Sequence, residues 1–360
     1  DAVGCIPGIL DLWFAQRVKY KDEMKKYGKA GNKEKYAFFH KRQLVQKILL
    51  NSLYGVLGLP AFRFYDVDNA TAVTTTGQTV IKSTADMANI KYNKELGDNT
   101  LDSNIYIDTD SVFFSAVPLL DRRIPNWKDN EQDTIAGFVN DIAEEMQDYL
   151  NDFYNILAEK VFNVDKDKHR FEIKKEYVSK SGIWIAKKRY AQWIISDNGV
   201  PVDKLDVKGL DVVRSSYPAA FRKFMSEVLI DILKGNTESE LTDKIYDFKN
   251  GLSKMNVVQI AKNTSVKNLT KYLPKGKQQR MFQFKSATPA HVKAAIAFNQ
   301  LLSHYNCEMK YEPMKNGDKV KWVYLKQNPL GLDGVAFKGY DDPKEIMELV
   351  NTYIDYDKIF

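Results

Sequence analysis

The sequence predicts an α+β fold, because its hydrophobic spacing changes between helical and strand periods along the chain. Two long helices are expected over residues 8–27 and 34–54, joined by the polar loop "GKAGNKEK". The apolar and β-branched run over 105–114 predicts a strand, a turn and a second strand. With 360 residues, of which 44% are hydrophobic, the chain is long enough for two or three domains.

The rest of the chain continues this mixed pattern. Residues 129–165 hold ten acidic residues against Lys160 alone, and their apolar side chains recur at helical spacing. We therefore expect an amphipathic helix there, with its polar face turned away from any bound polyanion. The other expected elements are an irregular stretch at 55–68, a helix at 75–94, extended segments at 170–178, 182–195 and 203–209, mainly helices over 217–303 and a late strand in "KVKWVYLKQN".

Charge is distributed unevenly. The net charge is only +6, yet residues 248–307 contain no Asp or Glu. A solvated surface usually mixes both signs, so a long one-sign stretch favours binding to a polyanion, with nucleic acid the leading candidate. The basic residues of this acid-free tract are Lys249, Lys254, Lys262, Lys267, Lys271, Lys275, Lys277, Arg280, Lys285 and Lys293.

Other classes of protein are disfavoured. No apolar run reaches the length of about 18–20 residues that a membrane span needs, so no membrane partner is expected. The two cysteines have neither metal-ligand spacing nor a disulfide framework, and the four histidines are scattered. A reducing compartment such as the cytoplasm is therefore expected. The chain begins Asp-Ala-Val without Met, which predicts a processed chain or a piece of a longer one.

Asp108 and Asp110 stand inside the apolar run "IYIDTDSVFF". In an extended chain these two positions share a face, and two adjacent carboxylates repel unless a cation lies between them. Mg²⁺ typically takes one or two carboxylates together with substrate phosphates. An Asp-rich turn exposed to solvent is the simpler explanation of "DTD". The apolar flanks and the basic tract favour metal-assisted phosphoryl transfer on nucleic acid.

The two N-terminal helices carry a second candidate group. Arg17 and Lys21 are four residues apart, and Lys47, Asn51 and Tyr54 are spaced by four and three, so each set shares a helix face. Facing helices could direct the three cations toward one point and neutralise a triphosphate. Each cation taken alone is more often a solvated surface residue, and only the combination supports this interpretation.

Five segments together resemble the family B DNA polymerases, with the phage replicative branch the most similar. "KILLNSLYG" (47–55) resembles the second fingers helix and "FAQRVKYK" (14–21) the first. "YIDTDS" (106–111) is similar to the palm metal motif. "KKRY" (187–190) resembles the strand that holds the primer–template, and "KGLDVVRSSYP" (208–218) the palm-to-thumb junction. Their order and approximate spacing agree with that family across nearly the whole chain.

The resemblance implies three domains: helical-hairpin fingers over 1–57, a partial palm with an antiparallel sheet flanked by helices over 58–210, and a mostly helical thumb over 211–360. It implies the C-terminal catalytic portion of a template-directed DNA polymerase, which uses Mg²⁺ to transfer a nucleotide from a dNTP to a primer 3′-hydroxyl. The implied partners are primer–template DNA, dNTPs, a complementary N-terminal polymerase polypeptide and a sliding clamp.

The resemblance also implies roles for single residues. Asp110 would bind both catalytic metals, with Asp108 as its supporting acid. Arg17, Lys21 and Lys47 would bind the triphosphate with help from Asn51, while Tyr54 and Gly55 would pack under the nascent base pair. On the "KKRY" strand, Lys188 and Tyr190 would touch the primer strand and Lys187 and Arg189 would face the other way, all four near DNA. Glu176 would be a further acid near the site, and the thumb residues Lys262, Lys267, Lys271, Lys285 and Lys293 would grip the duplex.

One departure from the family pattern is informative. The family's other metal aspartate lies in a motif Asp-x-x-Ser-Leu-Tyr-Pro, upstream of the first fingers helix, and these 360 residues do not contain it. "DVVRSSYP" (211–218) imitates that motif, but its Asp-to-Tyr spacing is one residue too long. The exonuclease domain is also outside this sequence. We therefore expect a fragment, or one half of a split polymerase whose second metal anchor lies on another polypeptide.

Three alternatives remain. A DNA-binding module without independent catalysis would explain the basic tract but neither the Asp pair nor the triphosphate clamp. A nuclease would use carboxylates and Mg²⁺ but would not need the clamp. A structural or partner-docking role for the acidic helix is the third. A thermal shift caused by nucleotide would favour a polymerase, and metal-dependent degradation of DNA would favour a nuclease.

Overall fold

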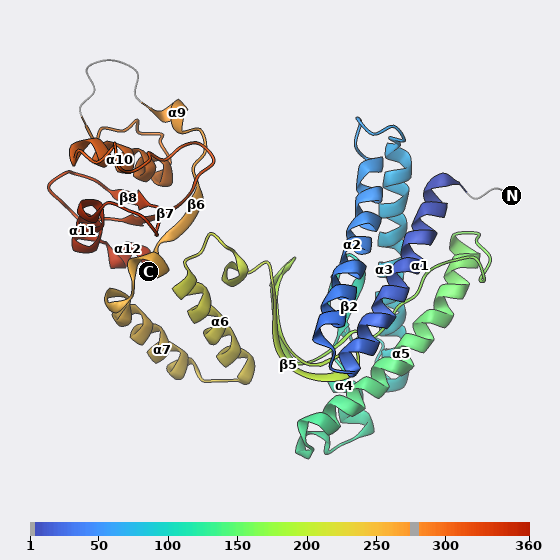
Figure 1. Cartoon of the computed structure of the whole chain (residues 1–360). Helices are drawn as coiled ribbons and strands as arrows, with labels where there is room; N and C mark the ends of the chain where they lie inside the picture. Colours follow the sequence, from blue (N-terminus) through green and yellow to red (C-terminus); the bar gives the residue numbers. More distant parts are fainter. Residues whose placement is uncertain (1–3, 274–280) are drawn as a thin grey trace. The chain divides into compact units, whose positions relative to one another are not determined.

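The computed structural model describes residues 4–273 and 281–360, and the chain divides into two compact units, Asp1–Pro118 and Leu119–Phe360 (Figure 1). Helices predominate in both units. Within the described residues there are also three antiparallel sheets, one of two strands and two of three strands. The mixture confirms the predicted α+β class.

The first unit begins with the predicted helical hairpin, formed by α1 (Cys5–Lys29) and α2 (Lys33–Leu57). Gly31 turns the chain with a φ of 68°, and Asn32 caps α2 by accepting a hydrogen bond from the Lys35 amide at 3.0 Å. Near this turn the rings of Tyr27 and Phe39 stack with their centroids 5.6 Å apart. Two helices joined by so short a loop pack antiparallel, as the sequence predicted.

The next helix, α3 (Val67–Leu96), begins earlier than predicted. Asp66 is its N-cap and accepts hydrogen bonds from the Asp68 and Asn69 amides, both at 3.0 Å. The first turns are rich in Thr and Val, whose helix propensity is low, so the pattern alone underestimated the helix. Since α2 also continues through Leu57, the prediction of an irregular stretch over 55–68 was wrong at both ends.

A two-stranded hairpin follows, made of β1 (Asn104–Asp108) and β2 (Ser111–Phe114). It is fastened to α3. The Asn104 side chain donates to the Ala85 carbonyl oxygen at 2.9 Å, and the Ser103 amide donates to Asn89 Oδ1 at 3.0 Å. The ring of Tyr92, fully buried, meets that of Phe114 edge to face at 5.7 Å. The predicted strand–turn–strand is confirmed, and α3 is its support.

Beyond this hairpin the chain forms α4 (Val117–Arg123), a 3₁₀ turn η1 (Trp127–Asp129) and the long helix α5 (Gln132–Val161). The acidic helix is thus confirmed. Its buried side includes Ile142, Met146 and Leu150, which the apolar spacing had selected. Arg123 of α4 binds the Glu145 carboxylate of α5 through two hydrogen bonds of 3.0 and 2.8 Å, so α4 is tied to the polar side of the helix.

An extended segment after α5 lies along that helix. Asn151 accepts from the Ile173 amide at 2.9 Å and donates to the Ile173 carbonyl oxygen at 3.0 Å, while Gln147 Oε1 accepts from the Lys175 amide at 2.9 Å. The backbone of this segment is therefore paired with side chains of a helix. The segment is extended as predicted, but a strand begins only at Tyr177.

A meander of three strands comes next: β3 (Tyr177–Ala186), β4 (Arg189–Asp197) and β5 (Val200–Lys208), in the order β3-β4-β5. The single extended segment predicted over 182–195 is in fact two strands joined by a turn at Lys187 and Lys188. Lys188 has a φ of 60°. The second turn is Asn198–Gly199, with φ of 51° and 78°, the left-handed pair that suits a tight β-hairpin.

Gly209 closes this meander against the Lys188 turn. It has a φ of 65°, and a Cβ placed there would lie only 2.0 Å from the Lys188 carbonyl oxygen. The 3₁₀ turn η2 (Asp211–Val213) follows directly. Glycine is therefore required at this position both for the backbone conformation and for the close approach.

The rest of the second unit combines helices with a small sheet of order β6-β7-β8. The helix α10 packs on β7 and β8, and Phe298, Leu301, Val335 and Phe337 are completely buried between them. The sequence predicted α10 and β7, but it missed β6 and β8, which have four residues each. The elements are α6 (Ala219–Lys234), α7 (Glu238–Gly251), η3 (Leu252–Lys254), α8 (Val257–Ile260), β6 (Lys262–Ser265), α9 (Leu269–Tyr272), α10 (Ala290–His304), β7 (Lys319–Tyr324), β8 (Gly334–Phe337), α11 (Lys344–Tyr353) and α12 (Tyr356–Ile359).

The close approach at Gly209 generates a test. Gly209→Ala should destabilise the protein in two ways, through a positive φ that costs about 1–2 kcal/mol and through a clash with Lys188 that adds about 1–3 kcal/mol. Gly199→Ala is the matched control, because Gly199 has a φ of 78° but no atom within 4 Å of an added Cβ. Urea unfolding should show the larger loss for Gly209→Ala. Equal losses would contradict the close approach.

Candidate active site and nucleic-acid contacts

The two predicted metal-binding aspartates lie around a tight turn. Asp108 ends β1, and Asp110 lies in the turn that precedes β2. The Asp110 amide donates to the Asp108 carbonyl oxygen at 2.6 Å, which closes a γ-turn around Thr109. Asp110 is therefore not part of an extended strand, and the expectation that both carboxylates share a strand face was wrong. They are instead neighbours around a turn.

Thr109, at the centre of this turn, has a φ of 57°. That conformation is strained for a β-branched residue, at a cost on the order of 1–3 kcal/mol. Local hydrogen bonds hold it: the Thr109 hydroxyl donates to Asp108 Oδ1 at 3.0 Å, and the Ser111 hydroxyl donates to the Asp108 carbonyl oxygen at 3.1 Å. The turn thus fixes the backbone that carries both carboxylates.

The donor chemistry of this turn fits Mg²⁺. Asp108 is half-buried and Asp110 is exposed, so both can present hard oxygen donors to an ion from solvent. Over residues 4–273 and 281–360, no cluster of three or more His, Cys, Asp or Glu is arranged to hold a metal. Two carboxylates are the number that Mg²⁺ typically takes when phosphates and water supply its other ligands.

The helical hairpin brings two of the predicted phosphate-binding cations to one level. Gln46 Nε2 donates to Gln16 Oε1 at 2.7 Å, which sets the register of α1 against α2. Arg17 and Lys47 follow these glutamines, so they lie within about 3 Å of each other along the helix axis, and Lys21 about 9 Å from Lys47. Lys21 and Lys47 are exposed and Arg17 is half-buried.

Arg17 also carries an unsatisfied donor. Its Nε atom is buried and has no hydrogen-bond partner among the residues that the structure describes. A buried donor without a partner costs about 1–3 kcal/mol, and hydrogen bonds from a guanidinium to an anion are among the strongest in proteins. Arg17 is therefore the cation of this group with the most to gain from a bound anion.

The other predicted fingers residues continue along α2. Asn51, Tyr54 and Gly55 are exposed, with Tyr54 retaining 39% of its accessible surface. A Cβ added at Gly55 would meet no atom within 4 Å. Packing within the described chain therefore does not require a glycine there, which leaves this surface open to a ligand.

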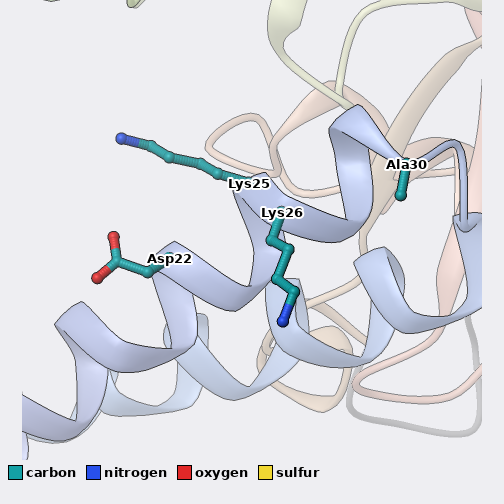
Figure 2. A pocket seen from close by; sticks show the side chains of 4 residues that line it. All are labelled: Asp22, Lys25, Lys26 and Ala30. Carbon is teal, nitrogen blue, oxygen red and sulfur yellow. The ribbon is translucent and has the colours of Figure 1, made fainter.

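Helix α3 connects the two halves of the candidate site. It contacts α2 and also both β1 and β2. The aspartate turn and the helical hairpin accordingly belong to one compact unit. The hollow that Figure 2 shows is a different feature, lined by Asp22, Lys25, Lys26 and Ala30 beyond Lys21 on α1. The Asp22 and Lys25 side chains extend away from the Lys26 side chain there, so these groups do not converge.

The "KKRY" segment differs from the prediction. Lys187 and Lys188 form the β3–β4 turn, so Lys188 and Tyr190 do not share a strand face, and only Arg189 and Tyr190 are in a strand. The positive φ of Lys188 interrupts the strand alternation on which the prediction depended. Tyr190 is buried, and its ring stacks on Trp184 with the centroids 6.3 Å apart.

Asp211 begins the segment whose sequence imitates a metal motif, and its carboxylate is paired with two arginines. Its carboxylate lies 3.1 Å from Arg214 and 3.6 Å from Arg189. Two cations at these distances neutralise the carboxylate without a metal, which agrees with the interpretation that this motif is an imitation. Arg189, predicted to lie near DNA, thus has a carboxylate partner within the chain.

Glu176 lies in an acidic neighbourhood of the second unit. Burial raises the pKa of Tyr177 to about 12, with further contributions from the charges of Glu176, Asp197 and Asp206. Tyr177 and Asp197 are cross-strand partners on β3 and β4. Glu176 and Asp197 therefore lie at one end of the meander, while Asp206 lies farther along it opposite Gln192, and all three are in a different unit from Asp108 and Asp110.

The acid-free tract spreads over several elements of the second unit. Lys267, Lys271 and Lys285 are exposed, whereas Lys262 and Lys293 are half-buried. The Lys262 ammonium lies over the rings of Tyr324 and Trp322, 5.0 and 5.5 Å from their centroids. Lys275, Lys277 and Arg280, which the sequence also counted in this tract, lie outside the described residues.

Comparison with known families decides the assignment. The model of DNA polymerase family B matches residues 1–163 and 138–360, which together cover the whole chain. The chain belongs to DNA polymerase family B.

Named relatives agree with this assignment. This family B chain is 30% identical over 332 residues to the DNA-directed DNA polymerase of Enterobacteria phage T4, an alignment covering 88% of the chain and 35% of that protein. It is 27% identical over 327 residues to the DNA-directed DNA polymerase of Escherichia phage RB69, covering 87% of the chain and 35% of that protein. It is 28% identical over 257 residues to the DNA polymerase of Thermococcus gorgonarius, an alignment covering 71% of the chain and 27% of that protein. The chain thus spans about a third of the length of these phage relatives.

The family assignment confirms the resemblance drawn from the five motifs at the level of the family. The phage relatives reported above are themselves DNA-directed DNA polymerases. No helix in the described ranges is long and apolar enough to span a membrane. The boundaries of fingers, palm and thumb, and the role of each site residue, stay predictions for this family B chain.

Proposed function

We propose that this chain is the C-terminal catalytic portion of a template-directed DNA polymerase, which transfers a nucleotide from a dNTP to the 3′-hydroxyl of a primer. One observation carries the proposal. A strained turn that bears Asp108 and Asp110 lies in the same compact unit as a helical hairpin that brings Arg17 and Lys47 to one level. Membership of family B gives this arrangement its reaction class.

In this proposal the helical hairpin binds the triphosphate. Arg17, with its unpartnered Nε, and the exposed Lys47 and Lys21 neutralise phosphate oxygens, and Asn51 assists. Tyr54 and Gly55 form the surface under the nascent base pair. These contacts orient the α-phosphorus toward the primer and stabilise negative charge that develops on the departing pyrophosphate.

The carboxylates of Asp110 and Asp108 would hold Mg²⁺, with Asp110 as the main ligand. Bound there, Mg²⁺ would acidify the primer 3′-hydroxyl and neutralise charge on the phosphates. The bond from the 3′-oxygen to the α-phosphorus forms as the bond from that phosphorus to pyrophosphate breaks. The family resemblance adds a second aspartate from the Asp-x-x-Ser-Leu-Tyr-Pro motif, supplied by a further segment or polypeptide.

Duplex DNA is the proposed partner of the second unit. The exposed Lys267, Lys271 and Lys285 of the acid-free tract provide a charge of one sign for backbone phosphates. In this proposal Lys187 and Lys188, in the β3–β4 turn, are two further lysines that contact DNA near the primer end. A sliding clamp and a complementary N-terminal polypeptide are further partners that the family resemblance suggests.

The alternative is a DNA-binding subunit without catalysis of its own. It is favoured by the two-carboxylate composition of the Asp108–Asp110 turn, because two-metal catalysis needs a further anchor. The alternative explains the basic tract of the second unit, but it gives no role to Arg17 and Lys47. The three experiments below separate these functions.

Asp110→Ala should abolish nucleotide addition in the enzyme reconstituted with the segment that carries the second aspartate. A loss of about 10³-fold in rate would correspond to roughly 4 kcal/mol of barrier. Asp108→Ala should cause a similar or smaller loss. Asp211→Asn is the control and should keep near-normal primer extension, since arginines already neutralise that carboxylate. Near-normal synthesis by Asp110→Ala would exclude the proposed role.

Lys47→Ala should raise the dNTP concentration needed for half-maximal extension by at least about tenfold, because a charge-assisted contact is worth about 1.5–3 kcal/mol. DNA affinity should stay unchanged, since Lys47 is assigned to the triphosphate. Lys25→Ala is a matched control, as Lys25 is an exposed lysine farther along the same helical hairpin. If DNA affinity fell and dNTP use stayed constant, the clamp assignment would be wrong.

The 360-residue chain alone should bind primer–template DNA but should not extend the primer. Binding should weaken steeply with salt, with a log–log slope of about −0.9 for each phosphate contacted. Fluorescence anisotropy measures the binding, and a primer-extension gel measures synthesis before and after addition of the polypeptide with the second aspartate. Robust extension without that polypeptide would contradict the need for a second metal anchor.

A further inference from the structure

The extended segment over residues 169–176, which we call the strap, is bound by amide side chains of α5. Asn151 accepts from the Ile173 amide at 2.9 Å and donates to the Ile173 carbonyl oxygen at 3.0 Å. Gln147 Oε1 accepts from the Lys175 amide at 2.9 Å. The strap precedes β3, so a helix here pairs with backbone groups that a neighbouring strand would pair with in a sheet.

A third amide continues the same spacing through a histidine. A backbone amide can only donate, so His169 Nδ1 accepts from the Phe171 amide at 3.1 Å and Nε2 faces Asn155 Oδ1 at 3.0 Å. Gln147, Asn151 and Asn155 are four residues apart, which is about 6 Å along a helix. The amides they reach on the strap are two residues apart, which is about 6.6 Å along an extended chain. Because the two repeats nearly match, the three side chains form a ladder, the amide ladder, that holds the strap in one register.

This register decides which way each strap side chain points. From the start of the strap to its end, odd-numbered residues are half-buried and even-numbered residues are exposed. On the half-buried side the Lys175 ammonium donates to the Glu144 carboxylate of α5 at 2.5 Å. The Phe171 ring meets that of Tyr154, also on α5, with the centroids 6.3 Å apart. Glu176 is on the exposed side, and a slip of one residue would exchange the two sides.

The end of the strap is fixed as well. The Asn198 amide donates to the Glu176 carbonyl oxygen at 2.7 Å, so the backbone of Glu176 is held while its side chain stays exposed. We propose that Gln147, Asn151 and Asn155 are positioning residues, which keep the Glu176 carboxylate on the exposed side of the strap for nucleotide addition. This inference rests on the proposed function and on the place near the site that the family resemblance implies for Glu176. The amide ladder binds neither dNTP nor DNA, and it acts on the reaction only through Glu176.

The main test measures primer extension by the reconstituted enzyme. Gln147→Met should lower the maximal rate of nucleotide addition about tenfold, because it removes the acceptor and leaves the strap amide unpaired. Gln147→Glu keeps the acceptor and should restore a near-normal rate. Asp152→Ala is the matched control, since Asp152 is exposed beside Asn151 on the same helix, and its rate should be unchanged. The dNTP concentration for half-maximal extension and the DNA affinity should stay constant in every variant.

A double-mutant cycle separates positioning from a merely structural role. Asn151→Leu removes both bonds to Ile173, so it should lower the rate in the wild-type background but cause no further loss in Glu176→Gln. An equal loss in both backgrounds would overturn the proposal, and so would equal rates for Gln147→Met and Gln147→Glu. Gln147→Met in the Glu176→Gln background repeats the cycle if Asn151→Leu does not fold.

Two further outcomes distinguish this inference from the proposed function. A normal rate for Glu176→Gln, with an active wild-type enzyme, would overturn the inference alone. Failure of the reconstituted wild-type enzyme to extend a primer would overturn the proposed function, and with it the assignment of Glu176 to nucleotide addition.

Discussion

The packing of the β1–β2 hairpin on α3 is the interaction on which the candidate active site depends. A two-stranded hairpin is at best marginally stable in water. Here the buried Tyr92 ring meets Phe114, and Asn89 and Asn104 join the helix to the backbone beside the hairpin. These contacts are strong enough together to hold Thr109 in a strained conformation at the tip. Without this support the turn that carries Asp108 and Asp110 could relax.

The second feature that the candidate sites have in common is a group of side chains with charge of one sign. Asp108 and Asp110 lie around one turn, and Arg17 and Lys47 lie at one level of the helical hairpin. Like charges held close together raise each other's electrostatic cost unless an opposite charge lies between them. By contrast, Asp211 is neutralised by Arg189 and Arg214 within the chain. This difference supports the prediction that Asp211 is not a metal ligand.

Much of the fold could be predicted because it depends on local pattern. The helical hairpin, the acidic helix and the strand–turn–strand around Asp108 follow from the spacing of apolar residues, and all are confirmed. The start of α3 was missed because a cap at Asp66 outweighs the low helix propensity of Thr and Val. The four-residue strands β6 and β8 were missed because short strands form only against a partner from elsewhere in the chain. The roles of the candidate site residues remain predictions.

The sequence by itself determined the family, the order of the motifs and the chemical type of each candidate side chain, because these depend on residue identity and spacing along one chain. Only the tertiary structure decided how those side chains are presented. The positive φ of Lys188 turned a predicted strand face into a hairpin turn, and the Asp110 amide closed a γ-turn where extended chain was expected. Likewise Lys262 and Trp322 are 60 positions apart in the sequence, and only the pairing of β6 with β7 makes them neighbours. Local periodicity cannot encode such contacts, because they arise when distant segments bury their apolar surfaces together.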